Sequence, residues 1–203
     1  MQRRHQVTVD ELATALGLAA ATVRRHLDIL QRDQLVSWTE ERRQTGRPHY
    51  VFFLTDNGHE RLPRQYDRLA SLLLHAVGTL NAQDTTGRTG PDVLELAMSR
   101  VGALLANDYR GQVKGDSLGD RVKQVVEVLG KESLAAESVT DEDAYRIYCY
   151  NCPFLRVATS HQVVCLAHQE MLSTLLAAPV RREESMAQGN ARCTYVVPLG
   201  DRT

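Results

Sequence analysis

The four cysteines of this 203-residue chain all lie within its last 55 residues. Arginines make up 21 of the 24 basic residues, and eight of these arginines stand in residues 1–50, beside six acidic residues. The formal net charge of -1 hides this uneven placement. Because thiols gather at one end and arginines at the other, and because the length allows two small domains, the sequence predicts two functional halves.

The composition excludes several classes of protein. A hydrophobic fraction of 43% is enough to bury cores, so wholesale disorder is excluded. No apolar run approaches the roughly 20 residues of a membrane-spanning helix, and the opening MQRRHQVTVD lacks the apolar stretch of a signal peptide. We therefore expect a cytoplasmic protein with no membrane partner, in which cysteines act as thiols or metal ligands rather than as disulfides.

The N-terminal half carries the pattern of two short helices. Thr8 and Glu11 form a capping box at the start of the first helix, and Gly17 ends it. A second amphipathic helix is predicted over residues 20–32. Its apolar face is formed by Val23, Leu27 and Leu30. Two helices joined by a tight turn indicate a helix-turn-helix, whose second helix enters the major groove of DNA.

The opposite face of the second helix is polar and basic. It presents Thr22, Arg24, Arg25, His26 and Asp28. Two strands, at residues 35–38 and 47–54, are predicted to flank a basic loop and so form a β-wing. The wing supplies Arg42, Arg43 and Arg47. These residues, apart from Asp28, are the candidate contacts with double-stranded DNA, to base edges or to phosphates, and a solvated basic face is the alternative.

Residues 7–60 resemble the winged helix-turn-helix repressors of the DeoR and ArsR type. The resemblance is carried by ELATALGLAAATVRRHLDILQRDQLV and by GRPHYVFFLTDNG, and it implies a DNA-binding domain over residues 1–60. Two features depart from the family pattern. Ala19 stands where such families place a Ser or Asp cap, which removes some local stability, and only residues 1–6 occupy the place of a preceding helix.

A heptad-like seam follows the wing. Its positions are Leu62, Tyr66, Leu69, Leu73, Ala76 and Leu80. The seam predicts a dimerisation helix, because a repressor that reads paired half-sites acts as a homodimer, and packing against the domain core is the alternative. The polar stretch at residues 81–92 predicts a linker. Residues 61–91 are therefore assigned to dimerisation and linking.

Residues 92–203 predict an α+β domain with helices against a small antiparallel sheet. Helical periodicity covers residues 93–112, 117–129 and 161–177, and strand pairs are expected at 134–139 with 144–150 and at 180–186 with 193–197. No phosphate-binding loop for a flavin or nicotinamide is visible. A Cys165–His168 nucleophilic site lacks an oxyanion-forming loop and a third orienting residue, so we expect no enzyme.

The thiol spacing is C-x2-C-x12-C-x27-C, formed by Cys149, Cys152, Cys165 and Cys193. Four soft ligands suit zinc or an iron–sulfur cluster. The spacing matches neither a paired-knuckle zinc ribbon nor the compact ferredoxin run, so it leaves the metal open. Buried cysteines without a metal are another reading, as is a redox disulfide between Cys149 and Cys152.

Three segments resemble the sensor half of the SufR-type transcriptional regulators. They are residues 149–155, 164–168 and 189–195. The resemblance implies a homodimeric repressor with one [4Fe–4S] cluster in each subunit, acting on the genes for iron–sulfur cluster assembly. A zinc-stabilised winged-helix regulator that senses a small molecule is the alternative function.

The same resemblance implies a set of cluster ligands. Cys152, Cys165 and Cys193 match the family's positions. Some members carry a further cysteine where this chain has Pro179, and Cys149 is the expected substitute. His161, His168 or a carboxylate are the other candidates for the fourth ligand.

Overall fold

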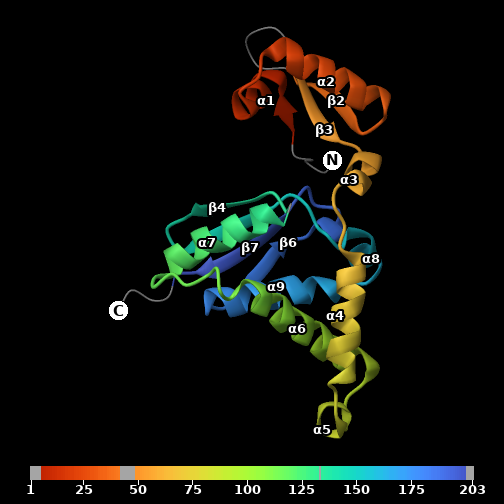
Figure 1. Cartoon of the computed structure of the whole chain (residues 1–203), viewed down its shortest axis with the longest axis vertical. Coiled ribbons are helices and arrows are strands. Elements are labelled where there is room, and N and C mark those ends of the chain that lie inside the picture. The colour runs from red at the N-terminus through yellow and green to blue at the C-terminus, as the bar shows by residue number, and fades with distance from the viewer. Residues whose placement is uncertain (1–5, 42–48, 133, 200–203) are drawn as a thin grey trace. The chain divides into compact units, whose positions relative to one another are not determined.

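The structure is a computed structural model that describes residues 6–41, 49–132 and 134–199 (Figure 1). It confirms the mixed α+β class. The chain divides into two compact units, Met1–Pro63 and Arg64–Thr203. None of the helices in the described ranges is long and apolar enough to cross a membrane.

The first unit combines helices with a three-stranded antiparallel sheet. Its elements are β1 (Val7–Thr8), α1 (Val9–Leu16), α2 (Ala20–Arg32), β2 (Val36–Glu41), β3 (His49–Leu54) and α3 (Asp56–Arg61). The strand order is β1-β3-β2, so β3 lies in the middle. The two predicted helices and the predicted strand pair are confirmed, and β2 extends three residues beyond the predicted strand, through Glu41.

Local signals at the ends of α1 act as the sequence predicts. Thr8 Oγ1 accepts a hydrogen bond from Glu11 N at 3.2 Å, and the Glu11 carboxylate accepts one from Thr8 N at 2.7 Å. Gly17 ends the helix with φ at 64°, a left-handed conformation that favours glycine. At the start of α2, Ala19 makes no side-chain cap, so the first peptide N–H groups of that helix lack this partner.

The core of the first unit is small. Val23, Leu27 and Val36 are its buried residues in one cluster, with Leu12, Ala13, Phe52 and Leu54 among the side chains packed against it. The predicted apolar face of α2 is correct for Val23 and Leu27. It is wrong for Leu30, which is 37% exposed because the core cluster reaches along α2 only as far as Leu27.

The second unit holds the larger core. Its helices are α4 (Tyr66–Gly78), α5 (Ala82–Thr85), α6 (Gly90–Tyr109), α7 (Leu118–Lys131), α8 (Leu155–Ser160), α9 (Val164–Leu176) and the short 3-10 helix η1 (Met186–Gln188). Its strands are β4 (Ala136–Thr140), β5 (Ala144–Cys149), β6 (Arg181–Glu184) and β7 (Cys193–Pro198). They form one antiparallel sheet in the order β4-β5-β7-β6, which confirms both predicted strand pairs and joins them through β5 and β7.

Helices α6 and α9 lie side by side in this unit (Figure 1). Their close approach depends on Gly102, because a Cβ atom there would lie 2.6 Å from Ala167 O and 2.6 Å from Glu170 Cβ. The backbone of α9 therefore rests directly on α6. Since Cys165 is the second residue of α9, the position of this cysteine is fixed by the same contact.

Helix α4 packs into the second unit. Leu69 and Ala76 are buried in its core, and Leu73 packs against it. For these seam positions the alternative is therefore correct, because core packing and a dimer seam use the same apolar spacing. Leu74 and Val77, on the other side of the helix, are 75% and 49% exposed.

The stretch predicted as a linker contains helix caps instead. Asn81 Oδ1 accepts hydrogen bonds from the peptide groups at the start of α5, and Thr89 forms a capping box with Asp92 at the start of α6. Cap residues and linker residues have the same polar composition, which is why the sequence pattern indicated a linker.

Candidate metal centre and nucleic-acid interface

Cys149 and Cys193 are direct partners on the neighbouring strands β5 and β7. Opposite residues in an antiparallel pair project from the same face of the sheet, with their Cβ atoms about 5 Å apart. Both side chains belong to the core of the second unit, at 2% and 6% exposed. The strand register therefore brings together two thiols that are separated by 43 intervening residues in the sequence.

Cys152 lies in the loop that follows β5. Its side chain is half-buried, and its sulfur accepts a hydrogen bond from the peptide N–H of Phe154. The carbonyl oxygen of Cys152 accepts a hydrogen bond from Arg64 Nη1 at 2.6 Å. This loop is thus held at both the sulfur and the backbone.

Cys165 and Cys193 share a polar neighbour in Ser185. Ser185 is 1% exposed, its Oγ lies 3.8 Å from Cys165 Sγ, and it also hydrogen bonds to Cys193. The peptide N–H of Met186 donates to Cys193 Sγ at 3.4 Å. The turn between β6 and β7 therefore supplies one hydroxyl and one peptide group to two of the sulfurs.

The thiols perturb one another electrostatically. Burial raises the pKa of Cys149 far above its ordinary value, and the neighbouring Cys193 and Cys152 raise it further. Burial, together with Cys193 and Cys165, raises the pKa of Cys152 to about 12. Burial also raises the pKa of Cys193, with Cys165 contributing in the same direction. These effects act over short distances, so the four cysteines lie near one another, and burial favours the protonated thiol at Cys149, Cys152 and Cys193.

Tyr195 lies beside the whole group. It is 2% exposed, and burial raises the pKa of its phenol well above the ordinary value, with all four cysteines adding to the effect. It stands two positions after Cys193 on β7, so the two side chains project from the same face of the strand. This period of two was visible in the sequence and identifies Tyr195, whereas no sequence signal points to Ser185.

The two histidines proposed as alternative ligands differ in position. His161 is exposed in the turn before α9. His168 lies between two aromatic rings, with its centroid 6.3 Å from Phe154 and 6.3 Å from Tyr195. Burial and the nearby Arg68 lower the pKa of His168 to about 4, so it is neutral near pH 7.

The donor set suits an iron–sulfur cluster in its chemistry. The four thiols come from a strand end, a loop, a helix start and a strand start, and peptide N–H groups donate to two of the sulfurs. Such hydrogen bonds to cysteine sulfur are a feature by which proteins tune iron–sulfur centres. Among the described residues, which include all four cysteines, no group of three or more Cys, His, Asp or Glu is already arranged to hold a metal ion.

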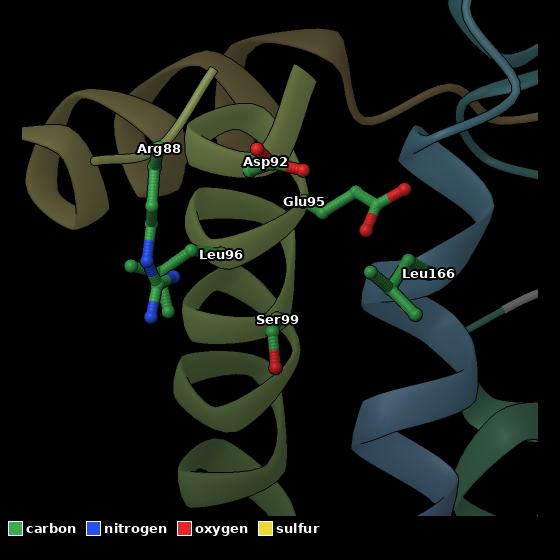
Figure 2. A pocket seen from close by; sticks show the side chains of 6 residues that line it. All are labelled: Arg88, Asp92, Glu95, Leu96, Ser99 and Leu166. Carbon is green, nitrogen blue, oxygen red and sulfur yellow. The ribbon is translucent and has the colours of Figure 1, made fainter. Parts of the chain in front are cut away.

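A groove is lined mainly by residues of α6 and by Leu166 of α9. It has a volume of about 470 Å³ and is lined by Arg88, Asp92, Glu95, Leu96, Ser99 and Leu166. Figure 2 shows the side chains of Glu95 on α6 and Leu166 on α9 extending toward one another across it. Because Leu166 follows Cys165 directly, this groove adjoins the helix turn that carries a candidate ligand.

The residues proposed to contact DNA from α2 are all exposed. Thr22, Arg24, Arg25 and His26 face solvent, while the buried Val23 and Leu27 anchor the opposite side of the helix. In the part of the chain that the structure describes, Arg24 and Arg25 pair with no carboxylate. The wing residues Arg42, Arg43 and Arg47 lie outside the described residues.

The described strands of the hairpin carry an aromatic pair that the sequence analysis did not single out. Trp38 on β2 and Tyr50 on β3 meet edge to face with their ring centroids 4.5 Å apart, and both are exposed. They occupy the same face of the sheet as the buried Val36. Trp38 lies two positions from Val36, and Tyr50 lies two positions from Phe52, which packs against the core. This spacing of two is the sequence signal that identifies the face.

No protein-family model, curated protein or solved structure matches this chain.

Proposed function

We propose that this chain is a homodimeric, DNA-binding transcriptional repressor that holds a [4Fe–4S] cluster in each subunit and controls genes for iron–sulfur cluster assembly. One observation carries the proposal. Four cysteines from separate elements gather around Tyr195 in a chain whose other unit exposes arginines along one helix. A metal-dependent group and a nucleic-acid surface in one chain are the parts that a metalloregulator requires.

We infer that the first unit is a winged helix-turn-helix with α2 as its recognition helix. The order of α1, α2 and the β2–β3 hairpin supports this, as does the exposure of the basic side of α2. Arg24 and Arg25 suit guanine edges or phosphates. The N-terminus of α2, which Ala19 leaves without a side-chain cap, has peptide N–H groups suited to a phosphate oxygen.

We infer that Cys149, Cys152, Cys165 and Cys193 hold the cluster. When bound, the cluster supplies an oxidation- and iron-dependent link among the segments that carry these residues. The chain contributes the peptide N–H groups of Phe154 and Met186, which stabilise thiolates at two ligands. Because the thiol pKa values are raised, the cysteines release protons when they bind the cluster. The affinity of the chain for the cluster therefore falls as the pH falls.

The homodimer requires an apolar surface that the fold leaves exposed. The buried seam of α4 is already used within the chain, so we assign dimer contact to its other side. Leu74 and Val77 lie there, three positions apart and therefore on one face of the helix. A charge at Leu74 tests this assignment, since Leu74→Glu is expected to give a monomer by analytical ultracentrifugation.

The deciding experiment is anaerobic reconstitution of the chain with iron and sulfide. We expect visible absorbance, on the order of four irons and four sulfides per chain, and tighter binding to a duplex selected by the loaded protein from a random-sequence pool. The metal-free chain should bind the same duplex more weakly. A colourless protein after reconstitution contradicts the cluster, and equal DNA affinity of both forms contradicts sensing.

A second function is favoured by the groove at α6 and α9. Its mixed charge, from Arg88, Asp92 and Glu95, suits a small polar ligand, and a structural zinc at the cysteines would stabilise the unit around it. Metal analysis separates the two functions. Zinc at one per chain, without acid-labile sulfide after anaerobic purification, favours the small-molecule regulator.

A further inference from the structure

The loop that carries Cys152 is hydrogen bonded to the residues that open the second unit. Arg64 Nη1 donates to Cys152 O at 2.6 Å and to Asn151 Oδ1 at 3.0 Å. One residue later, Gln65 N donates to Pro153 O at 3.2 Å. Three consecutive residues of the loop thus accept hydrogen bonds from two consecutive residues of the chain.

Arg64 and Gln65 lie at the boundary between the two units. Pro63 is the last residue of the first unit, and Arg64 is the first residue of the second. Helix α4 begins at Tyr66, with Gln65 as its N-cap residue. Any change in the backbone of the Cys152 loop therefore acts on the residues through which the chain leaves one unit and enters the other.

The next turn of α4 is fixed to a separate part of the unit. Arg68 Nη2 lies 2.8 Å from Asp108 Oδ2 and donates to the Tyr109 hydroxyl at 3.0 Å, while Arg68 Nη1 lies 3.2 Å from Glu132 Oε2. Gln65 Nε2 also donates to this Glu132 carboxylate at 2.9 Å. These contacts join α4 to the C-terminal ends of α6 and α7. The residues just before α4 are also bonded to the Cys152 loop.

We propose that Arg64 is the positioning residue that couples the state of the Cys152 loop to the first unit, which rests on the proposed function of that unit and of the cysteines. With Cys152 bound as a ligand, its carbonyl is fixed and Arg64 is held. With the cluster absent, the loop loses this link, and any shift of its backbone also shifts Cys152 O and Asn151 Oδ1, which accept hydrogen bonds from Arg64.

The test compares two arginines whose hydrogen bonds lie near opposite ends of α4. Arg64→Met keeps the apolar stem and removes the donors beside the Cys152 loop. Arg100→Met is the matched control, because Arg100 Nη1 donates to Thr79 O at 2.9 Å and Arg100 Nη2 pairs with Asp84 at 2.7 Å, at the opposite end of α4. For each protein we measure iron and sulfide per chain, and the affinity of the loaded and metal-free forms for the selected duplex.

We expect wild type and Arg100→Met to show the same ratio of loaded to metal-free affinity, in the range of about 5- to 150-fold that allosteric coupling usually gives. Arg64→Met should load iron and sulfide normally and show a ratio close to one. A normal ratio in a loaded Arg64→Met protein overturns the inference while leaving the proposed function intact. A ratio of one in the wild type itself overturns the proposed function, and this inference with it.

A second measurement needs no variant and covers the case in which Arg64→Met does not load. Hydrogen exchange followed by mass spectrometry reports the protection of peptides spanning residues 62–69 in wild type. The Gln65 amide, bonded to Pro153 O, should be protected in the loaded protein and exchange at least tenfold faster after metal removal. Equal exchange in both forms overturns the inference, because the loop then does not act on Gln65.

Discussion

The ring of His168 meets the ring of Tyr195 edge-on, with 6.3 Å between their centroids. Burial raises the pKa of the Tyr195 phenol, and all four cysteines add to this shift, so His168 packs against a neighbour of the thiols. The imidazole is also flanked by Phe154. Aromatic packing accounts for its position without a metal, and this distinguishes it from Cys149, which stands directly opposite Cys193.

The fourth ligand can therefore be identified by two substitutions. We expect Cys149→Ser to lower iron and sulfide per chain to the level of Cys165→Ser, because both changes remove a thiol from the shared group. His168→Phe preserves the aromatic packing and should load normally. Iron and sulfide counts after anaerobic reconstitution check both results. Full loading of Cys149→Ser together with loss in His168→Phe would show that the histidine completes the site.

The raised thiol pKa values predict how the metal-free protein responds to pH. Free thiols have a pKa of about 8.5, and burial raises the pKa of Cys149, Cys152 and Cys193 in the folded chain. Above about pH 8.5 the unfolded chain loses thiol protons that the folded chain keeps, so the free energy of unfolding falls as pH rises. The limiting slope is about 1.4 kcal/mol per pH unit for each such thiol.

Urea denaturation of the metal-free, reduced protein at about pH 7.5 and about pH 9.5 measures this loss. Cys149→Ser serves as the control, because it removes the most deeply buried thiol and should lose less stability between the two conditions. Stability that is constant or rises over this interval would contradict the assignment of buried, protonated thiols.

The sequence was most informative where local chemistry decides the structure. The capping box of Thr8 and Glu11 and the stop at Gly17 depend on residues within a few positions, and both are confirmed. The periodicity of α2 is confirmed for Val23 and Leu27. The strand pair β4–β5 was likewise set by alternation around a short polar turn. Such elements follow from propensity and capping, without knowledge of their tertiary partners.

The parts that the sequence did not determine depend on long-range contacts. An apolar face such as that of Leu69 and Ala76 has the same spacing whether it packs against a second subunit or against the core of its own chain. The pattern alone therefore could not distinguish a dimer contact from a core contact. The cysteines were identified by residue type. Their grouping around Tyr195 required the β5–β7 register, and no local pattern placed Ser185 next to two of them.

Gly102 predicts a link between helix packing and the metal centre. A methyl group there would lie 2.6 Å from Ala167 O, so Gly102→Ala must displace α9 and Cys165 with it. Overpacking of this kind lowers the free energy of unfolding by about 1–3 kcal/mol, and we expect reduced cluster loading as well. Urea denaturation and iron counts measure the two effects.

Gly130 provides the matched control for this change. It also lies within a helix, α7, but a Cβ there would have no neighbour within 4 Å. Gly130→Ala should therefore raise stability by up to about 1 kcal/mol through helix propensity and leave loading unchanged. Normal loading in Gly102→Ala would mean that α9 absorbs the displacement away from Cys165.

The DNA surface gives the last prediction. Arg24→Ala and Arg25→Ala should each weaken binding to the selected duplex, by about 5- to 150-fold if the side chain reads a base, and leave the absorbance of the loaded protein unchanged. Arg32→Ala is the control, since Arg32 lies in the last turn of α2 and pairs with Asp33 at 3.5 Å.

Changes at the wing residues Arg42 and Arg43 should weaken binding to all DNA sequences alike. They should also reduce the slope of log affinity against log salt concentration by about one for each phosphate that the variant no longer neutralises. Equal losses of affinity at Arg24 and Arg32 would show that α2 contributes general charge and that its exposed face does not read the sequence.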